Sequence, residues 1–281
     1  MIDASMRARN HWYNRIGLLV ARVTSFAVTG ILLAIIGYLA VHGLPRFSTG
    51  FFLEYPVNLG REGGILPILV STALLAVVSL AIAVPLGVAT AVYLTEYTRE
   101  GRLTTVIRFG AECLAGIPSI IFGLFGFLLF VVSLKMGWSI LSGGLTLACM
   151  VLPTIIRTSE EAIKAVPGGL RQLGFSLGAT KSQVILHIVL PQAKNGILTG
   201  IILSLGRVIG ETACVIFTTG ISMEMPSSLF DSARSMSVHF YLLAREGISM
   251  EMAYTTAFTL VLLILLVNTA ANLLMRKAGK R

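Results

Sequence analysis

Long apolar runs alternate with short polar segments along the whole chain. The runs fall near residues 18–41, 66–94, 109–133, 139–156, 195–219 and 253–275. Each is close to the roughly 20 residues that a helix needs to cross the hydrocarbon core of a bilayer. The pattern therefore predicts an all-α integral membrane protein with six transmembrane helices.

Composition supports this class and excludes a soluble domain. Hydrophobic residues make up 55% of the chain, charged residues only 12%, and the mean hydropathy is +0.85. A typical soluble domain has about 25% charged residues. The first run follows a basic tail, as in a secretory signal. It is too long for a signal and has no small-residue cleavage site, so we expect it to stay as an anchor.

Lysine and arginine gather on one side of the predicted membrane. Fifteen lie in the two tails and in the loops 95–108 and 157–194, and five lie in the other loops. The five are Arg46, Arg61, Lys135, Arg234 and Arg245. The positive-inside rule then puts both termini in the cytoplasm. The net charge of +9 is thereby explained by topology, and no nucleic-acid partner is expected.

The chain shows no internal repeat and reads as one membrane domain. We expect a tail, first helix and external loop over 1–65, a transmembrane core over 66–275, and a basic cytoplasmic tail over 276–281. The first helix is a peripheral addition to the core. External loop 220–252 is amphipathic and predicts a short helix, which either faces a partner or caps the bundle.

Three cysteines, Cys113, Cys149 and Cys214, lie in apolar runs without metal-ligand spacing. We expect them to be small core residues. No metal ligands and no catalytic residues are predicted, because no nucleophile and base or ligand set can be assembled. A membrane-embedded enzyme is therefore disfavoured.

The predicted cytoplasmic loop 157–194 carries strong helix boundary signals. Pro167 suits the first turn of a helix, and Gly178 suits the position just after its end. Thr180 followed by Gln183 fits a capping box that opens a second helix. The sequence thus predicts two helices joined by a sharp turn at Gly178.

Pro191 is expected to close that second helix. A capped helix pair of this kind fits a lever that docks in another protein, or an amphipathic helix that lies on the membrane. Periodicity alone does not choose between the two.

The spacing within the loop resembles the EAA loop of binding-protein-dependent ABC importer permeases. Gly178 is followed after nine residues by Ile188, and then by Leu190 and Pro191, as in that family. The chain departs where residues 172–174, Gln-Leu-Gly, replace Glu-Ala-Ala. The resemblance, over about 66–275, implies a type I (MetI-like) permease core. It also implies that this loop contacts an ATPase through Arg171, Gln172, Leu173, Gly174, Gly178, Ala179, Ile188, Leu190 and Pro191.

Three further segments resemble the phosphate permeases of the PstA type within that family. They are residues 116–126, 157–162 and 206–213. The resemblance implies a permease subunit of an ATP-driven phosphate importer in the inner membrane, surrounded by membrane lipid. Its partners would be a second, homologous permease, two copies of an ATPase and an external phosphate-binding protein. ATP and Mg would be bound by the ATPase, with no cofactor in this chain.

Two alternatives keep the membrane location but change the function. One is a permease for another oxyanion or small solute. The other is a self-contained channel or ion-coupled carrier, which would usually show inverted repeats or several intramembrane charges.

Arg207 and Glu211 are the central charges of the fifth run. Their spacing of four predicts one face of one helix. A charge at the bilayer centre costs roughly 2.5–3.5 kcal/mol on insertion scales, which pairing reduces. The pair either locks helix packing or lines a substrate path, where the planar guanidinium suits phosphate.

Two more residues are candidates for the path. Glu112 would form an ion pair with Arg108 or with a charge on a partner chain. Ser119 ends a Gly-Ile-Pro-Ser break at 116–119, where freed backbone N–H groups favour anions; a simple kink explains the break equally well. Small residues repeat every four positions on the fifth run and predict close helix packing, either internal or between subunits. They are Gly196, Gly200, Gly206 and Gly210.

Overall fold

The computed structural model describes residues 4–99 and 101–278. The ends of the two predicted tails, 1–3 and 279–281, lie outside the described residues. The helices are α1 (Ala4–Gly43), α2 (Thr49–Leu53), α3 (Leu66–Val92), α4 (Arg102–Ala115), α5 (Ser119–Gly126), α6 (Ile140–Lys164), α7 (Gly168–Ser176), α8 (Lys181–Val184), α9 (Leu190–Gly210), α10 (Ala213–Thr218), α11 (Met236–Arg245) and α12 (Met250–Ala278).

Shorter elements connect these helices. The π-helical turns are η3 (Tyr93–Tyr97), η4 (Phe127–Ser133) and η5 (Ile185–Val189), and the 3-10 turns are η1 (Leu44–Arg46) and η2 (Asn58–Gly60). Two short antiparallel strands, β1 (Pro56–Val57) and β2 (Glu62–Gly63), pair Pro56 with Gly63.

Five of the six predicted membrane helices are confirmed, and the run predicted over 109–133 is sharply bent. Within the described residues, five helical stretches are long and apolar enough to cross a membrane. Helix α4 and the stretch of α5 with η4 pass the same test only together, and they meet at an angle of 102°, so they form either a sixth, broken span or a re-entrant loop. The break lies at Gly116–Pro118, where the sequence predicted it. Pro118 has no N–H to continue the helix, and the residue before it is disfavoured in a helical conformation.

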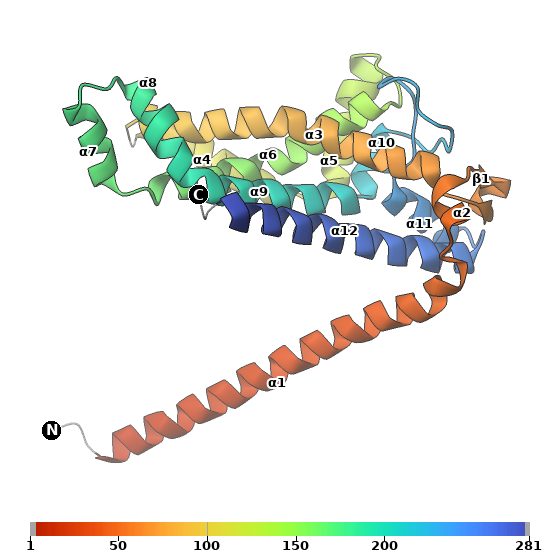
Figure 1. Cartoon of the computed structure of the whole chain (residues 1–281), viewed down its shortest axis with the longest axis horizontal. Coiled ribbons are helices and arrows are strands. Elements are labelled where there is room, and N and C mark those ends of the chain that lie inside the picture. Colours follow the sequence, from red (N-terminus) through yellow and green to blue (C-terminus); the bar gives the residue numbers. More distant parts are fainter. Residues whose placement is uncertain (1–3, 100, 279–281) are drawn as a thin grey trace.

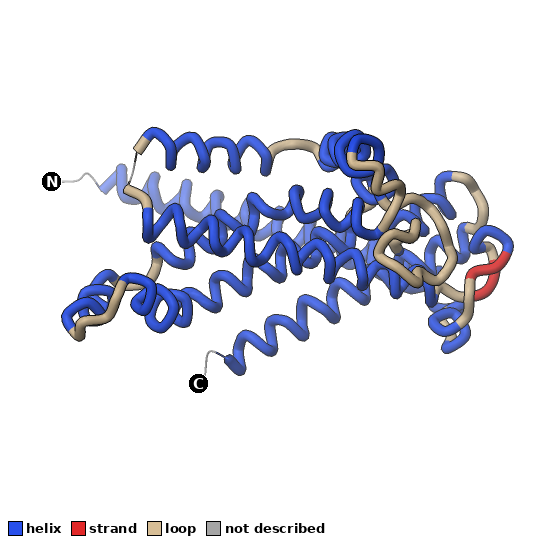
Figure 2. Tube along the Cα trace, turned by 90° about the horizontal axis from the view of Figure 1, so that it is seen from above, coloured by secondary structure: helices blue, strands red, loops and turns tan. Residues whose placement is uncertain are grey.

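Helix α6 lies at the centre of the bundle, with α3 and α9 against it (Figure 1). Its fully buried side chains include Leu147, Val151 and Ile155. Figure 1 shows α3, α9 and α12 running along the long axis of the molecule, and the view from above shows long helices in the same direction (Figure 2). The buried apolar side chains form three clusters along this bundle.

Small residues let the central helices touch. A Cβ added at Gly87 of α3 would lie 2.6 Å from Cγ2 of Ile155, and one at Gly196 of α9 would lie 2.5 Å from Cβ of Ala162. A Cβ at Gly200 would collide with the Thr158 side chain. The predicted packing role is confirmed for Gly196 and Gly200, and it is internal to the chain.

Helix α1 leaves the bundle at one end and diverges from it (Figure 1). It is longer than predicted, because most of the expected N-terminal tail is helical. Its last turn is held by α12, where Thr255 Oγ1 donates to the Gly43 carbonyl at 3.1 Å and Arg46 pairs with Glu251 at 2.8 Å. Most of its apolar side chains, such as Phe26, are exposed. The helix is thus a peripheral addition, as expected from the sequence.

The end of the bundle opposite α7 and α8 is covered by a compact cap. The 42–64 segment packs on α11, and a Cβ at Gly60, where φ is +88°, would lie 2.5 Å from the His239 ring. Burial and the nearby Arg234 charge lower the pKa of His239 to about 3, so its ring is neutral. The predicted short helix in loop 220–252 is confirmed as α11, and it caps the bundle.

A turn of this cap is held by one carboxylate. Asp231 accepts hydrogen bonds from the Ser227 hydroxyl and from the backbone N–H groups of Ser227 and Ser228, each at 2.8 Å. These bonds lower the pKa of Asp231. The turn leaves Phe230 exposed at the surface of the cap.

Single cysteines would test the orientation predicted from the charge asymmetry. In a background without the three native cysteines, Lys181→Cys and Glu224→Cys each replace an exposed side chain, at opposite ends of the bundle. We expect an impermeant maleimide to label Glu224→Cys in intact spheroplasts and Lys181→Cys only after lysis. Labelling of Lys181→Cys before lysis would show that the orientation is reversed.

Candidate functional site

The cytoplasmic loop predicted from the sequence forms a corner between α7 and α8. Gly178 has φ +78° and follows the end of α7, as predicted for a glycine in this position. Thr180 accepts from the Gln183 N–H, and the Gln183 side chain accepts from the Thr180 N–H, which confirms the capping box. Pro167 lies at the N-cap, one residue before the helix.

The loop is shorter than predicted, because helices occupy both of its ends. Helix α6 continues to Lys164, and one helical stretch runs from Lys181 through to Gly210. The expectation that Pro191 closes a helix was wrong. The π-helical turn η5 precedes it, with the Leu190 N–H bonded to the Ile185 carbonyl, and the wider turn makes room for the proline ring.

The far end of α7 presents apolar side chains to the surroundings. Leu173 is 58% exposed and Leu177 is 80% exposed, with Phe175 beside them. Gln172 is also exposed. We call these four residues the α7 tip. These exposed apolar side chains make the α7 tip a candidate interaction surface.

The other side of α7 packs onto the helix that follows. Gly174 is buried, and a Cβ there would lie 2.7 Å from Cδ1 of Ile188 and 2.9 Å from Cγ2 of Val184. The Ala179 N–H donates to the Gly174 carbonyl at 3.1 Å. The glycine at position 174 thus allows α7 and η5 to lie in contact.

Arg171 anchors α7 to two membrane helices. Its guanidinium donates to Oε1 of Glu96, at the end of α3, from Nε at 3.1 Å and Nη2 at 2.8 Å. It also donates to the carbonyls of Ile163 at 2.8 Å and Val166 at 2.6 Å, at the end of α6. We call this set the Arg171 anchor. Arg171 and Glu96 are 21% and 11% exposed, so Arg171 faces inward and is a positioning residue.

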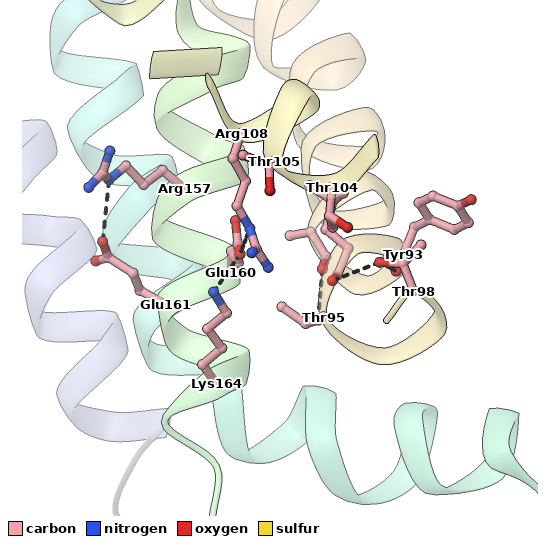
Figure 3. A network of polar contacts seen from close by, with 12 residues as sticks. Tyr93, Thr95, Thr98, Thr104, Thr105, Arg108, Arg157, Glu160, Glu161 and Lys164 are labelled. Atoms are coloured by element: carbon pink, nitrogen blue, oxygen red, sulfur yellow. Dashed lines mark hydrogen bonds and ion pairs between the residues drawn. The ribbon is translucent and has the colours of Figure 1, made fainter. Parts of the chain in front are cut away.

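A network of charges joins α4 to the C-terminal half of α6 (Figure 3). Buried Glu160 pairs through Oε1 with Arg108 and with Lys164, each at 2.6 Å. Arg157 pairs with Glu112 at 2.8 Å and more loosely with Glu161 at 3.4 Å. These side chains line a cavity of about 330 Å³.

Glu112 therefore has a partner that the sequence did not suggest. It pairs with Arg157 of α6, while Arg108 pairs with Glu160. The sequence signal was present, since residues 157–162 were singled out as a family segment, but nothing in it showed which charges meet.

Arg207 and Glu211 do not lie on one helix, contrary to prediction. Helix α9 ends at Gly210, and Glu211 has an extended backbone with ψ 129°. The Glu211 side chain accepts from the Cys214 N–H at 3.4 Å and so caps α10. Within the described residues no ion pair joins Glu211 to Arg207, whose side chain is exposed.

The break before α10 lies close to the break before α5. A Cβ at Gly123 of α5 would lie 3.0 Å from Cα of Cys214 and 3.1 Å from the Ala213 carbonyl. Ser119, half-buried, opens α5 one turn earlier. The structure thus brings Ser119 and Glu211 into one region, while Glu112 belongs to the separate α4–α6 network.

Two amides beside α9 were missed from the sequence. Asn268 and Asn272 of α12, with Thr199 and Gly206 of α9, line a groove of about 220 Å³. Two amides four residues apart in an apolar run are a signal that could have found them. Within the described residues, no group of three or more potential metal ligands occurs.

Residues 83–281 match the protein family described as "Binding-protein-dependent transport system inner membrane component". The match covers well over half of the chain. The chain belongs to this family. The resemblance predicted from the loop and the three segments is thereby confirmed, and members of this family are membrane subunits of transporters.

Curated relatives cover most of the chain. The "Phosphate transport system permease protein PstA" of Pasteurella multocida is 32% identical over 246 residues, covering 86% of this chain and 87% of the relative. "PstA 1" of Mycobacterium tuberculosis is 36% identical, covering 78% and 73%. The "Probable ABC transporter permease protein YqgI" of Bacillus subtilis is 30% identical, covering 87% and 89%.

Solved structures support the fold. A bacterial ABC transporter for import of the polysaccharide alginate aligns with TM-score 0.66 at 15% identity, covering 98% of this chain and 99% of that chain. The MetNI methionine ABC transporter aligns with TM-score 0.59 at 21% identity, covering 76% and 94%. These likenesses confirm the predicted MetI-like core.

Replacing Arg171 would test the anchor. Hydrogen bonds to charged groups contribute about 1.5–3 kcal/mol each, and Arg171→Ala would also leave Glu96 unpaired in a largely buried position. We expect limited proteolysis between 165 and 180 to become at least about tenfold faster. Arg157→Ala is the matched control, because it breaks exposed pairs that contribute about 1 kcal/mol or less. Equal cleavage of Arg171→Ala and wild type would contradict an anchoring role.

Proposed function

We propose that this chain is the permease subunit of an ATP-driven importer of inorganic phosphate. The observation that carries the proposal is its 32–36% identity to phosphate permeases over most of their length. The alternative of a self-contained carrier has no support from these relatives. The chain would then form part of the path through which phosphate crosses the membrane.

The partners follow from the same proposal. The α7 tip supplies an exposed apolar surface for an ATPase, and two such subunits would bind ATP and Mg. No cofactor is needed in this chain. A second, homologous permease would complete the path, and an external phosphate-binding protein would deliver phosphate to the cap at the other end.

The membrane is proposed to be the cell inner membrane, with both termini in the cytoplasm. The excess of lysine and arginine on the side of α7 supports this orientation. The start of α1, the end of α12 and α7 lie toward the same end of the molecule (Figure 1). An ATPase in the cytoplasm would therefore reach the α7 tip.

Arg207 is the residue most suited to phosphate. It is exposed on α9, within a stretch apolar enough to span a membrane. Facing lipid, its charge would cost roughly 2.5–3.5 kcal/mol on insertion scales. This side of α9 is therefore proposed to face the path or the second permease. The guanidinium can donate two hydrogen bonds to phosphate oxygens and stays charged.

The other candidate residues have different proposed roles. Glu211 and Ser119 lie at the starts of α10 and α5, where backbone N–H groups and a carboxylate are close to the path. The carboxylate would limit how tightly an anion is held, because a path must release what it binds. Glu112, already paired with Arg157, would keep the cytoplasmic end of the path aligned.

Gly178→Val would test the coupling loop. A Cβ at Gly178 meets nothing within 4 Å, so the substitution acts through its positive φ alone, at about 1–2 kcal/mol. We expect a several-fold fall in ATP-driven phosphate uptake and in ATPase association. Gly169→Val is the control, since that position is equally open and has no positive φ. Unchanged uptake in Gly178→Val would remove the corner from the coupling mechanism.

Arg207→Gln would test the path. We expect normal assembly and at least about tenfold lower uptake of radiolabelled phosphate per assembled complex. Arg207→Lys should also transport poorly, because it keeps the charge but loses the planar pair of donors. Arg102→Gln removes an exposed cation elsewhere and should transport normally. Wild-type uptake per complex in Arg207→Gln would place the residue outside the path.

A further inference from the structure

An apolar groove runs along the cytoplasmic half of α3. One wall comes from α3, including Val84, Pro85 and Ala89, and the other from η5 and the start of α9, including Leu186 and Leu190. Its volume is about 670 Å³. We call it the α3 groove. Its lining includes none of Arg171, the α4–α6 network and Arg207, and it shares Leu190 with the predicted coupling loop.

Small side chains and irregular backbone create the groove. Pro85 and Ala89 offer little bulk on the surface of α3 and are both exposed. The opposite wall is not a regular α-helix, because Leu186 belongs to the π-helical turn η5.

The length of the groove matches one leaflet of a bilayer. From Val84 to Tyr97 the helical rise is about 20 Å. Half of the hydrocarbon core is roughly 15 Å deep. The groove thus extends from near the middle of the membrane to the boundary at the ends of η3 and α8.

The boundary end is aromatic and cationic. Tyr97 and Ser182 meet at 3.3 Å between their hydroxyl oxygens, and Lys181 Nζ lies 5.0 Å from the centroid of the Tyr97 ring. Arg99 follows two residues later and is exposed. The nearest described carboxylate along the chain, Glu96, is engaged by Arg171 and does not neutralise Lys181.

We propose that the α3 groove binds an anionic phospholipid of the cytoplasmic leaflet. One acyl chain would lie between Ala89 and Leu186, and the headgroup phosphate would meet Lys181, Tyr97 and Ser182. Basic sites between membrane helices on this side bind anionic headgroups. The cytoplasmic placement rests on the orientation proposed above.

The cation at the mouth of the groove favours a phospholipid over an apolar helix of a partner. A phospholipid supplies both an acyl chain for the apolar walls and a phosphate for Lys181. A lipid there would contact both α3 and the helix that carries the coupling corner. It would thereby stabilise the packing of these two elements next to the Arg171 anchor.

Native mass spectrometry of the full-length chain, purified with its partner subunits, would test the site. Phosphatidylglycerol is the probe, and phosphatidylcholine is the comparison. Ala89→Phe fills the groove, and Val77→Phe places the same ring at an exposed position of α3 outside it. Lys181→Glu reverses the charge at the mouth.

We expect the wild type and Val77→Phe to retain phosphatidylglycerol. We expect Ala89→Phe and Lys181→Glu to retain at least about fivefold less, and phosphatidylcholine to bind several-fold more weakly to the wild type. Equal retention in Ala89→Phe and Val77→Phe, or no preference for the anionic lipid, would overturn the proposal. Efficient disulfide or maleimide crosslinking of Ala89→Cys to a second permease would also overturn it, because a protein would then occupy the groove.

Discussion

Close contact of α3 and α9 with α6 is the constraint on which the rest of the structure depends. Within a bilayer, helices gain no hydrophobic free energy by leaving lipid for one another, so association relies on tight packing and a few polar bonds. Gly87, Gly196 and Gly200 permit that packing, because any larger side chain would meet Ile155, Ala162 or Thr158. Helix α6 is thus packed between α3 and α9, and the glycines set how closely each of these helices approaches it.

Both ends of α6 are in contact with the segments that are candidates for function. At the end next to α7, the carbonyls of Ile163 and Val166 accept hydrogen bonds from Arg171, which also pairs with Glu96 of η3, so α7 is attached to both α6 and the stretch that continues α3. One turn earlier Glu160 holds α4 through Arg108. The broken helices α5 and α10 pack on α6 and on each other near its other end. The corner between α7 and α8 and the proposed phosphate path are thus both attached to α6.

The single chain exposes both apolar and polar surfaces, and in a bilayer each kind needs a matching environment. In the described part of the chain, helix α1 packs on α12 near its C-terminal end. Arg207 is exposed on α9, and the amides Asn268 and Asn272 line a groove beside α9. Apolar surface can be covered by lipid, whereas polar surface needs a polar partner or water. The proposed second permease and a hydrated path would meet that need. The α3 groove, in contrast, has the length and charge of a lipid site.

Local features were determined by the sequence alone. Runs of about 20 apolar residues specify membrane helices, and the positive φ of Gly178 and the Thr180–Gln183 capping box depend only on neighbours within a few residues. Tertiary structure decided the rest. Glu112 meets Arg157 across 45 residues, and Glu211 leaves its helix to cap α10. Pro191 does not end its helical stretch, because the π-helical turn η5, which packs on α7, precedes it. These outcomes depend on which helices lie side by side, and short-range pattern carries no information about that.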